Sequence, residues 1–351
     1  MLILAGMLGV IVAILVWPGE REPEYQGKTL SEWLRYPNSD LQETAVRAIG
    51  THALPWLLKW IQKDRPASKS LKVNLRTLLR RESGEVPGIP VLKPWLDRPT
   101  DDDRDMGLKG FYLLGPRASS AIPELTRLMN ESKSPAVSAS ALSALGAIGQ
   151  EALPILVAAL DNPQAQNRGN VAYRIATMAR RGTDAKAAVP VLIKCLRDKD
   201  TEVAEAAARS LGELALSPKI VVPALTNAMQ DRRVVVRVAS IRALEPFRAQ
   251  AAPAIPQLVA RLADGNPAVA QYAAGALGKI GQEPETVVPA LAASLQSTNR
   301  AVRAFALLAL GRFGSNAQPA MEAIRGQLND RDFEIRRQAT NALQAIEARR
   351  E

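Results

Sequence analysis

Apolar residues recur along the chain with the spacing of one helical face. In the stretch ALSALGAIGQEALP, Ala141 to Pro154, small residues stand four and one positions before Leu145, and the large apolar Ile148 stands three positions after it. Offsets of three and four place side chains on the same face of a helix. A glycine follows, and a proline begins a second apolar run. The pattern predicts a helix, a turn and a second helix, because glycine tolerates the left-handed conformation that ends helices and proline fits a first helical turn.

The same pattern returns at an almost constant interval. Successive equivalents of Leu145 are 33, 35 and 31 positions apart and then six times 33 apart. They are Val46, Leu79, Leu114, Leu145, Met178, Leu211, Leu244, Leu277, Leu310 and Leu343. One such unit cannot bury its apolar face alone, so a fixed period of this length predicts stacked units. We expect an all-α fold, an α-α superhelix or solenoid of about ten helical pairs over residues 38–351.

Two further positions keep this register. A helix-ending glycine follows four residues after the key apolar residue at Gly50, Gly149, Gly182, Gly281 and Gly314. A proline suited to the first turn of the second helix stands at Pro55, Pro90, Pro123, Pro154, Pro190, Pro223, Pro256 and Pro289. Polar connectors such as RDKDTE and NDRD then close one unit and open the next.

The ALG-x-IG core, the proline after it and connectors ending in Val-Arg together resemble the HEAT repeats, and in particular the short bacterial type similar to the repeats of phycobilisome lyases. The last feature is intact at Val236-Arg237 and Val302-Arg303, and as Ile335-Arg336. The resemblance covers about residues 38–351 and implies an armadillo-like helical scaffold that binds proteins. A bilin-lyase-like role is a weaker alternative, because no chromophore-handling residue is matched.

The N-terminal residues stand apart from the repeats. Residues 2–17 form an uninterrupted apolar run, LILAGMLGVIVAILVW, that ends at Trp17. We expect residues 1–19 to be a single-pass transmembrane anchor, an N-terminal hydrophobic helix whose tryptophan suits the membrane interface. A cleaved signal peptide is the rival, but no basic residue precedes the run and no small residues mark a cleavage site. The side of the membrane on which the repeats lie stays undecided.

A short capping helix is predicted between the anchor and the repeats. Within residues 20–37, Thr29 and Glu32 have the spacing of a capping box, and Leu30, Trp33 and Leu34 form one apolar edge. The segment YxGKxLSxWL that contains them is similar to one found ahead of HEAT arrays in membrane-anchored or exported bacterial proteins. We therefore expect residues 20–37 to be a linker and an N-terminal cap.

Positive charge is concentrated near the first units. The net charge is +10, and the stretch from Lys59 to Arg81 is rich in basic residues. Helical spacing places several of them in one stripe; the candidate partner-binding or anionic-surface residues are Lys59, Lys63, Lys69, Lys72, Arg76 and Arg80. Such a stripe can attract anionic lipid, an acidic protein or a nucleic-acid backbone, or it can be an ordinary solvated helix face.

The sequence contains no catalytic constellation. One histidine and one cysteine leave little for metal or acid–base chemistry, so we expect no enzyme activity, no metal and no cofactor. The hypothesis is a membrane-tethered, non-enzymatic scaffold that binds an unidentified protein or peptide, with nucleic-acid binding as the alternative. We expect the binding surface on the second helices, where the outward candidates are Thr226, Gln230, Gln257, Arg261, Glu322 and Arg325.

Overall fold

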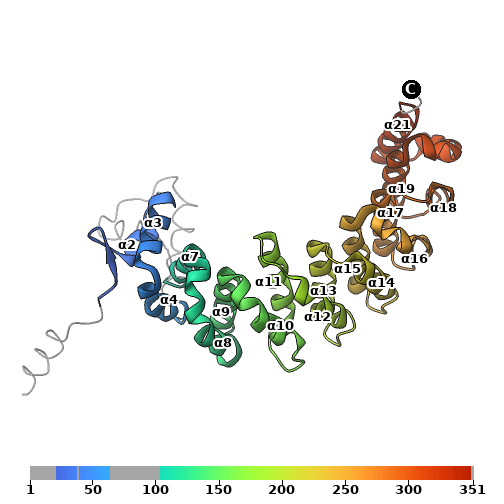
Figure 1. Ribbon diagram of the computed structural model, residues 1–351. Helices are drawn as coiled ribbons and strands as arrows, with labels where there is room; N and C mark the ends of the chain where they lie inside the picture. Colours follow the sequence, from blue (N-terminus) through green and yellow to red (C-terminus); the bar gives the residue numbers. More distant parts are fainter. Residues whose placement is uncertain (1–20, 38, 64–102, 349–351) are drawn as a thin grey trace, which may run out of the picture. The chain divides into compact units, whose positions relative to one another are not determined.

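The computed structural model describes residues 21–37, 39–63 and 103–348 (Figure 1). In these residues the elements are helices apart from one short hairpin, and connectors join them, which confirms the all-α repeat fold. No helix among them has the length and apolar character needed to cross a bilayer. The predicted anchor, residues 2–17, lies outside the described residues, as does Leu79.

The elements fall into two compact units, Met1–Ala152 and Leu153–Glu351. The first contains β1 (Glu24–Tyr25), β2 (Lys28–Thr29), α2 (Leu30–Arg35), α3 (Ser39–Ile49), η1 (Gly50–Ala53), α4 (Leu54–Ile61), α7 (Asp103–Leu114), η2 (Gly115–Ala121), α8 (Ile122–Glu131), α9 (Pro135–Ile148) and η3 (Gln150–Ala152). The second contains α10 (Leu153–Asp161), α11 (Arg168–Arg180), η4 (Lys186–Ala188), α12 (Val189–Cys195), α13 (Thr201–Leu214), α14 (Pro218–Ala228), α15 (Val234–Leu244), η5 (Glu245–Ala254), α16 (Ile255–Arg261), α17 (Pro267–Ile280), α18 (Pro284–Ser294), α19 (Arg300–Phe313), η6 (Gly314–Ala320), α20 (Met321–Gly326), η7 (Gln327–Asn329) and α21 (Phe333–Glu347).

The predicted N-terminal cap is present and is preceded by the β1–β2 hairpin. The capping box is confirmed, because the Thr29 side chain accepts from the Glu32 backbone N–H and Glu32 accepts from the Thr29 N–H at 2.7 Å. Leu30, Trp33 and Leu34 are buried as one edge. The helix end is covered by Gln42 of α3, whose side chain donates to the Trp33 and Leu34 carbonyl oxygens, both at 2.8 Å. These contacts join the cap to the first helical pair.

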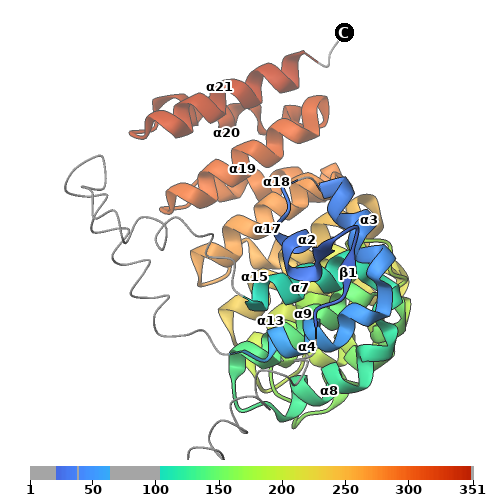
Figure 2. The same ribbon diagram turned by 90° about the vertical axis from the view of Figure 1, so that its left-hand side faces the viewer.

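Helical pairs repeat through the second unit. Each pair has a first helix with the key apolar residue (α11, α13, α15, α17, α19) and a shorter second helix beside it (α12, α14, α16, α18, α20), and the first helix α21 follows the last pair. In Figure 1 the first helices follow one another along one side and the second helices along the other. Figure 2 shows α17, α19 and α21 as successive layers. First helices pack closely on one another, whereas second helices make few mutual contacts.

The key apolar residues are buried in both units. Val46, Leu114, Leu145, Met178, Leu211, Leu244, Leu277 and Leu310 are each at most 2% exposed. Leu343 in α21 is half-buried. The predicted register is therefore confirmed for the described units, and Cys195 is a buried core residue as expected for a small apolar side chain.

The predicted helix-ending glycines all have positive φ, at Gly50, Gly149, Gly182, Gly281 and Gly314. The structure adds two positions in the same register where the residue is not glycine. Ala215 ends α13 with φ 47°, and Arg248 has φ 49° and ψ −129°. Both adopt a backbone conformation that costs an L-residue free energy.

The prediction for two prolines was wrong. Pro223 and Pro289 lie inside α14 and α18 instead of in a first turn. Each of these helices begins five residues earlier, at Pro218 or Pro284, which takes the first-turn position. An extra helical turn therefore precedes the predicted start. The other predicted prolines among the described residues each stand at the second position of their helix.

Candidate functional site

The connectors between units share a ladder of acidic residues that the sequence analysis did not single out. Asp198, Asp231, Asp264 and Asp330 stand in one register, 33 or 66 residues apart. Each accepts the backbone N–H of the residue two positions later, at 2.8–3.0 Å. This bond shapes the turn that leads into the next first helix. The recurrence of aspartate every 33 residues in the connectors is the sequence signal that could have identified this ladder.

The arginines of the Val-Arg pairs join neighbouring connectors. Arg237 donates to the carbonyl oxygen of Asp231 at 2.9 Å and to the carboxylate of Asp264, one connector further, also at 2.9 Å. Arg303 makes the equivalent pair with the Ser297 carbonyl oxygen and the Asp330 carboxylate, both at 2.9 Å. The residues that carry the family resemblance therefore fasten the units together along the connector edge.

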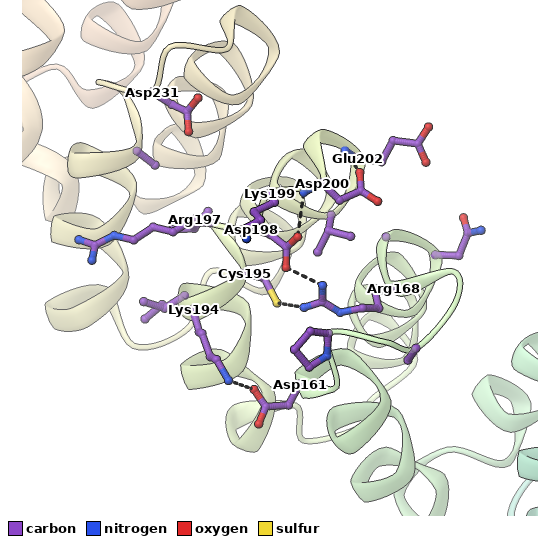
Figure 3. A pocket seen from close by; sticks show the side chains of 18 of the residues that line it. Asp161, Arg168, Lys194, Cys195, Arg197, Asp198, Lys199, Asp200, Glu202 and Asp231 are labelled. Carbon is purple, nitrogen blue, oxygen red and sulfur yellow. Dashed lines mark hydrogen bonds and ion pairs between the residues drawn. The ribbon is translucent and has the colours of Figure 1, made fainter. Parts of the chain in front are cut away.

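A large cleft of the second unit lies at this edge. It has a volume of about 1520 Å³ and is lined by the connectors that precede α11, α13 and α15 (Figure 3). Its deepest polar group is Arg168, whose side chain is 9% exposed. The guanidinium donates to Asp198 at 2.5 Å and to the Leu160 carbonyl oxygen at 2.9 Å, and it lies 3.6 Å from the Cys195 sulfur. This cluster is drawn at the centre of Figure 3.

The polar groups that line the cleft have a structural role. Burial raises the pKa of the Cys195 thiol, with a smaller opposing effect from Arg168, so the group stays protonated at neutral pH and is a poor nucleophile. Lys194 pairs with Asp161 at 2.5 Å. Because its charged groups mostly satisfy one another, we interpret the cleft as the joint between units and not as a ligand site.

The first-helix row has a different surface. A groove of about 510 Å³ lies between α13 and α15, and its lining includes Val234, Val235 and Val238. Val235 is 45% exposed. Apolar residues at outward positions of a helix are unusual in a solvated array, where polar residues are expected. The groove is therefore the best candidate for a binding surface in the second unit.

Apolar side chains continue from this groove along the row. Tyr272 of α17 packs edge-on against Phe305 of α19, with ring centroids 6.0 Å apart, and both rings are half-buried. Leu308, one turn further along α19, is 41% exposed. We call the outward surface made by Val235, Val238, Tyr272, Phe305 and Leu308 the apolar strip. It crosses three successive first helices, α15, α17 and α19.

Basic residues border the apolar strip. Each of its three helices has one cation in its last turn: Arg242, Lys279 and Arg312. Arg242 lies over the Tyr272 ring, 5.4 Å from its centroid. Lys279 pairs with Glu245. Within the described residues Arg242 and Arg312 form no ion pair.

The predicted basic stripe is only partly described. Lys63 is ion-paired with Asp103 at 2.6 Å, and Lys59 lies over the Trp56 ring at 4.9 Å. These two side chains are engaged within the first unit. Lys69, Lys72, Arg76 and Arg80 lie outside the described residues, so the stripe stays a prediction.

The second-helix candidates are less suited to binding than expected. Thr226 donates to the Val222 carbonyl oxygen at 2.8 Å, and Arg261 pairs with Asp264 at 3.2 Å. Gln230 and Asp231 belong to the connector-edge cleft. Glu322 and Arg325 are exposed and polar, as in an ordinary solvated helix face. The structure places the accessible apolar surface mainly on first helices instead, because large exposed residues such as Tyr173, Val235 and Leu308 lie there.

Comparisons with known proteins agree with this architecture. The family model described as HEAT repeats matches residues 89–176, 167–245, 222–299 and 255–344. A crystal structure of a Kap121p mutant is similar, at 14% identity and a TM-score of 0.55, over 90% of this chain and 41% of that one. A crystal structure of an engineered protein is 20% identical, with a TM-score of 0.46, over 91% of this chain and 98% of that one. Computationally designed armadillo repeat proteins for modular peptide recognition are 18% identical, with a TM-score of 0.44, over 55% and 99% of the two chains. No curated protein matches the chain.

The helical-pair fold and the connectors joined by Arg237 and Arg303 define an α-solenoid scaffold. Since the matched segments together run from residue 89 to residue 344, they cover well over half of the chain. The chain belongs to the HEAT-repeat family. The finer likeness to the repeats of phycobilisome lyases stays a prediction.

Proposed function

We propose that the chain is a non-enzymatic scaffold that holds a protein or peptide partner on its first helices, and that residues 2–17 tether it to a membrane. HEAT and armadillo-like solenoids are suited to protein–protein interaction because stacked units give an extended surface for a partner. The observation that carries the proposal is the apolar strip. Its side chains would be removed from water by a partner, which favours binding by about 25 cal/mol for each Å² of apolar surface buried.

The tether is supported by the uninterrupted apolar run itself, LILAGMLGVIVAILVW. Sixteen helical residues extend about 24 Å, close to the roughly 30 Å of a hydrocarbon core. The test is fractionation of cells that produce the full chain or a chain without residues 2–17. The full chain should sediment with membranes and the shortened chain should not; if both remain in the soluble fraction, the tether is wrong.

The binding surface can be tested by photo-crosslinking in the cells that make the protein. A photoreactive amino acid at Val235 or Leu308 should give adducts with a partner protein. Matched positions on the other row are Ile220 of α14, which is 51% exposed, and Glu322 of α20. Adducts from Ile220 and Glu322 alone, or from none of the four positions, contradict the assignment to the first helices.

A further inference from the structure

We propose that the apolar strip and its bordering cations bind an extended partner segment that is both acidic and apolar. The inference rests on the proposed function and specifies the chemistry of the partner. It follows from the charges and side chains of α15, α17 and α19, taken in turn.

The charge of this surface is unbalanced. The outward residues of the three helices include the cations Arg242, Lys279 and Arg312. Glu245 at the start of η5 is paired with Lys279. Glu205 and Glu213 of α13 line the same groove as Arg242, but they are paired with Arg209 and Arg180. A cation in a last turn also complements the helix dipole, but this interaction leaves a guanidinium free to donate outward. Arginine binds carboxylates through two parallel hydrogen bonds. Arg242 and Arg312 are therefore the expected contacts for two acidic residues.

Apolar side chains lie between these arginines, beside the ion pair of Lys279 and Glu245. Tyr272 and Phe305 form an edge-to-face pair, and Leu308 projects beside them. Aromatic and aliphatic side chains of a partner would bury surface there, and an aromatic partner side chain would also pair with these rings. A purely acidic segment would leave this area uncovered. The complementary segment therefore needs apolar residues between its carboxylates.

The spacing of those carboxylates follows from helix packing. Packed helices lie about 8–10 Å apart, so Arg242 and Arg312, on helices two steps apart, are separated by roughly 20 Å. An extended chain advances about 3.3 Å per residue and covers this distance in about six residues. The expected segment has two acidic residues about six positions apart with apolar side chains between them.

A nucleic acid fits this surface less well. A duplex presents phosphates at short, regular intervals and is bound by contiguous cations. Here Arg242 and Arg312 are separated by the apolar strip, and Lys279 between them is neutralised by Glu245. Valine and leucine offer nothing to a phosphate backbone.

The test is a selection from a random-peptide display library against the full-length protein in detergent. Enriched peptides should contain acidic and apolar residues, and their affinity should fall about tenfold with Arg242→Gln or with Arg312→Gln, as expected for the loss of one charge-assisted hydrogen bond. Leu308→Ser should also weaken binding. Matched controls are Arg197→Gln, an exposed cation of the connector edge, and Ile220→Ser on α14, which should leave affinity unchanged. Circular dichroism of each variant checks that the fold is kept.

Several results would overturn the inference. Enrichment of basic or purely neutral peptides, no enrichment at all, or equal losses with Arg197→Gln would show that the charge assignment is wrong. Duplex DNA bound at physiological salt and lost with Arg242→Gln would assign the surface to nucleic acid instead. The crosslinking experiment above separates these failures from failure of the scaffold function, because adducts at Val235 and Leu308 form whatever the partner's charge.

Discussion

Gly278 in α17 lies so close to Ala309 in α19 that a β-carbon on the glycine would stand 2.6 Å from the Ala309 Cα. Gly311 occupies the same register one unit later, yet its β-carbon would stand 3.4 Å from the Ala342 Cα, an ordinary contact. The two glycines therefore have the same sequence position within their units but differ in the space available for a side chain. Close packing of first helices depends on the absence of a side chain at Gly278.

This difference predicts opposite effects of alanine. Gly278→Ala should destabilise the α17–α19 contact by about 1–3 kcal/mol through overpacking, even though alanine favours helix by about 1 kcal/mol over glycine. Gly311→Ala should be neutral or stabilising by up to about 1 kcal/mol. Amide hydrogen exchange in α17 and α19 measures the change locally. Equal exchange rates in the two variants would mean that the close approach at Gly278 does not limit packing.

Arg248 predicts a stabilising substitution. It has φ 49° and ψ −129°, while Gly314 in the same register has φ 55° and ψ −134°. Because glycine adopts this conformation without a side-chain clash, Arg248→Gly should raise the free energy of unfolding by about 1–2 kcal/mol. The measurement is the midpoint of urea unfolding. Gly314→Ala serves as the reverse control and should lower that midpoint; a lower midpoint for Arg248→Gly as well would show that the arginine side chain makes a compensating contact.

Ser240 predicts a second stabilising substitution. Its hydroxyl is fully buried and has no hydrogen-bond partner within the described residues. The equivalent residues Ala207, Ala273, Ala306 and Ala339 show that alanine fits this site. Ser240→Ala should therefore raise the thermal midpoint, with a gain of about 1 kcal/mol. Ser210, whose hydroxyl donates to the Ala172 carbonyl oxygen at 2.9 Å, is the matched control, and Ser210→Ala should lower the midpoint. A loss of stability in both variants would contradict the unsatisfied state of Ser240.

The connector ladder predicts acid sensitivity. Donation by Arg233 holds the pKa of Asp231 below its ordinary value. For Asp264, burial acts to raise the pKa, but the Asn266 N–H and Arg237 together outweigh it, so this pKa is also lowered. A carboxyl whose pKa is lower in the folded than in the unfolded state stabilises the fold above the unfolded pKa, near 4, and this stabilisation is lost as the pH falls through the folded pKa.

Below about pH 4 the free energy of unfolding should therefore decrease, and Asp231→Asn or Asp264→Asn should lower stability at pH 7 while making this acid decrease smaller. Urea unfolding between neutral and acidic pH measures both effects. Glu202, an exposed carboxylate at the start of α13 for which no comparable bonds are seen, provides the control as Glu202→Gln. An unchanged acid profile in both aspartate variants would remove the ladder as its cause.

Much of the fold could be predicted because the repeat consists of residues with strong local conformational preferences. The burial of Leu211 and Leu277 follows from helical spacing, and the positive φ of Gly281 from the properties of glycine. The capping box of Thr29 and Glu32 is likewise a local signal. Ala215 and Arg248 could not be predicted in the same way, because their positive φ is disfavoured by alanine and arginine and no local signal in the sequence indicates it.

The candidate site was harder to predict than the fold. A binding surface depends on which outward residues of different units come together, and no local rule fixes this. The basic stretch from Lys59 was conspicuous in the sequence, but Tyr272 and Phe305, 33 residues apart, meet only because α17 packs against α19. Comparing outward positions of first helices in register would have paired Tyr272 with Phe305, but Val235 and Leu308 stand at other positions of their units.

Arg237 joins the connectors that precede α15 and α17, Arg303 joins those that precede α19 and α21, and the first helices of the second unit are in close contact. The equivalent position in α17 is Ala270, so no such arginine joins the connectors before α17 and α19. The second helices touch one another far less. Bending of the second unit is therefore expected to separate its second helices while leaving the pitch of the first row nearly constant. A partner spanning α15 to α19 is therefore expected to meet nearly the same distance between Arg242 and Arg312 when the second unit bends.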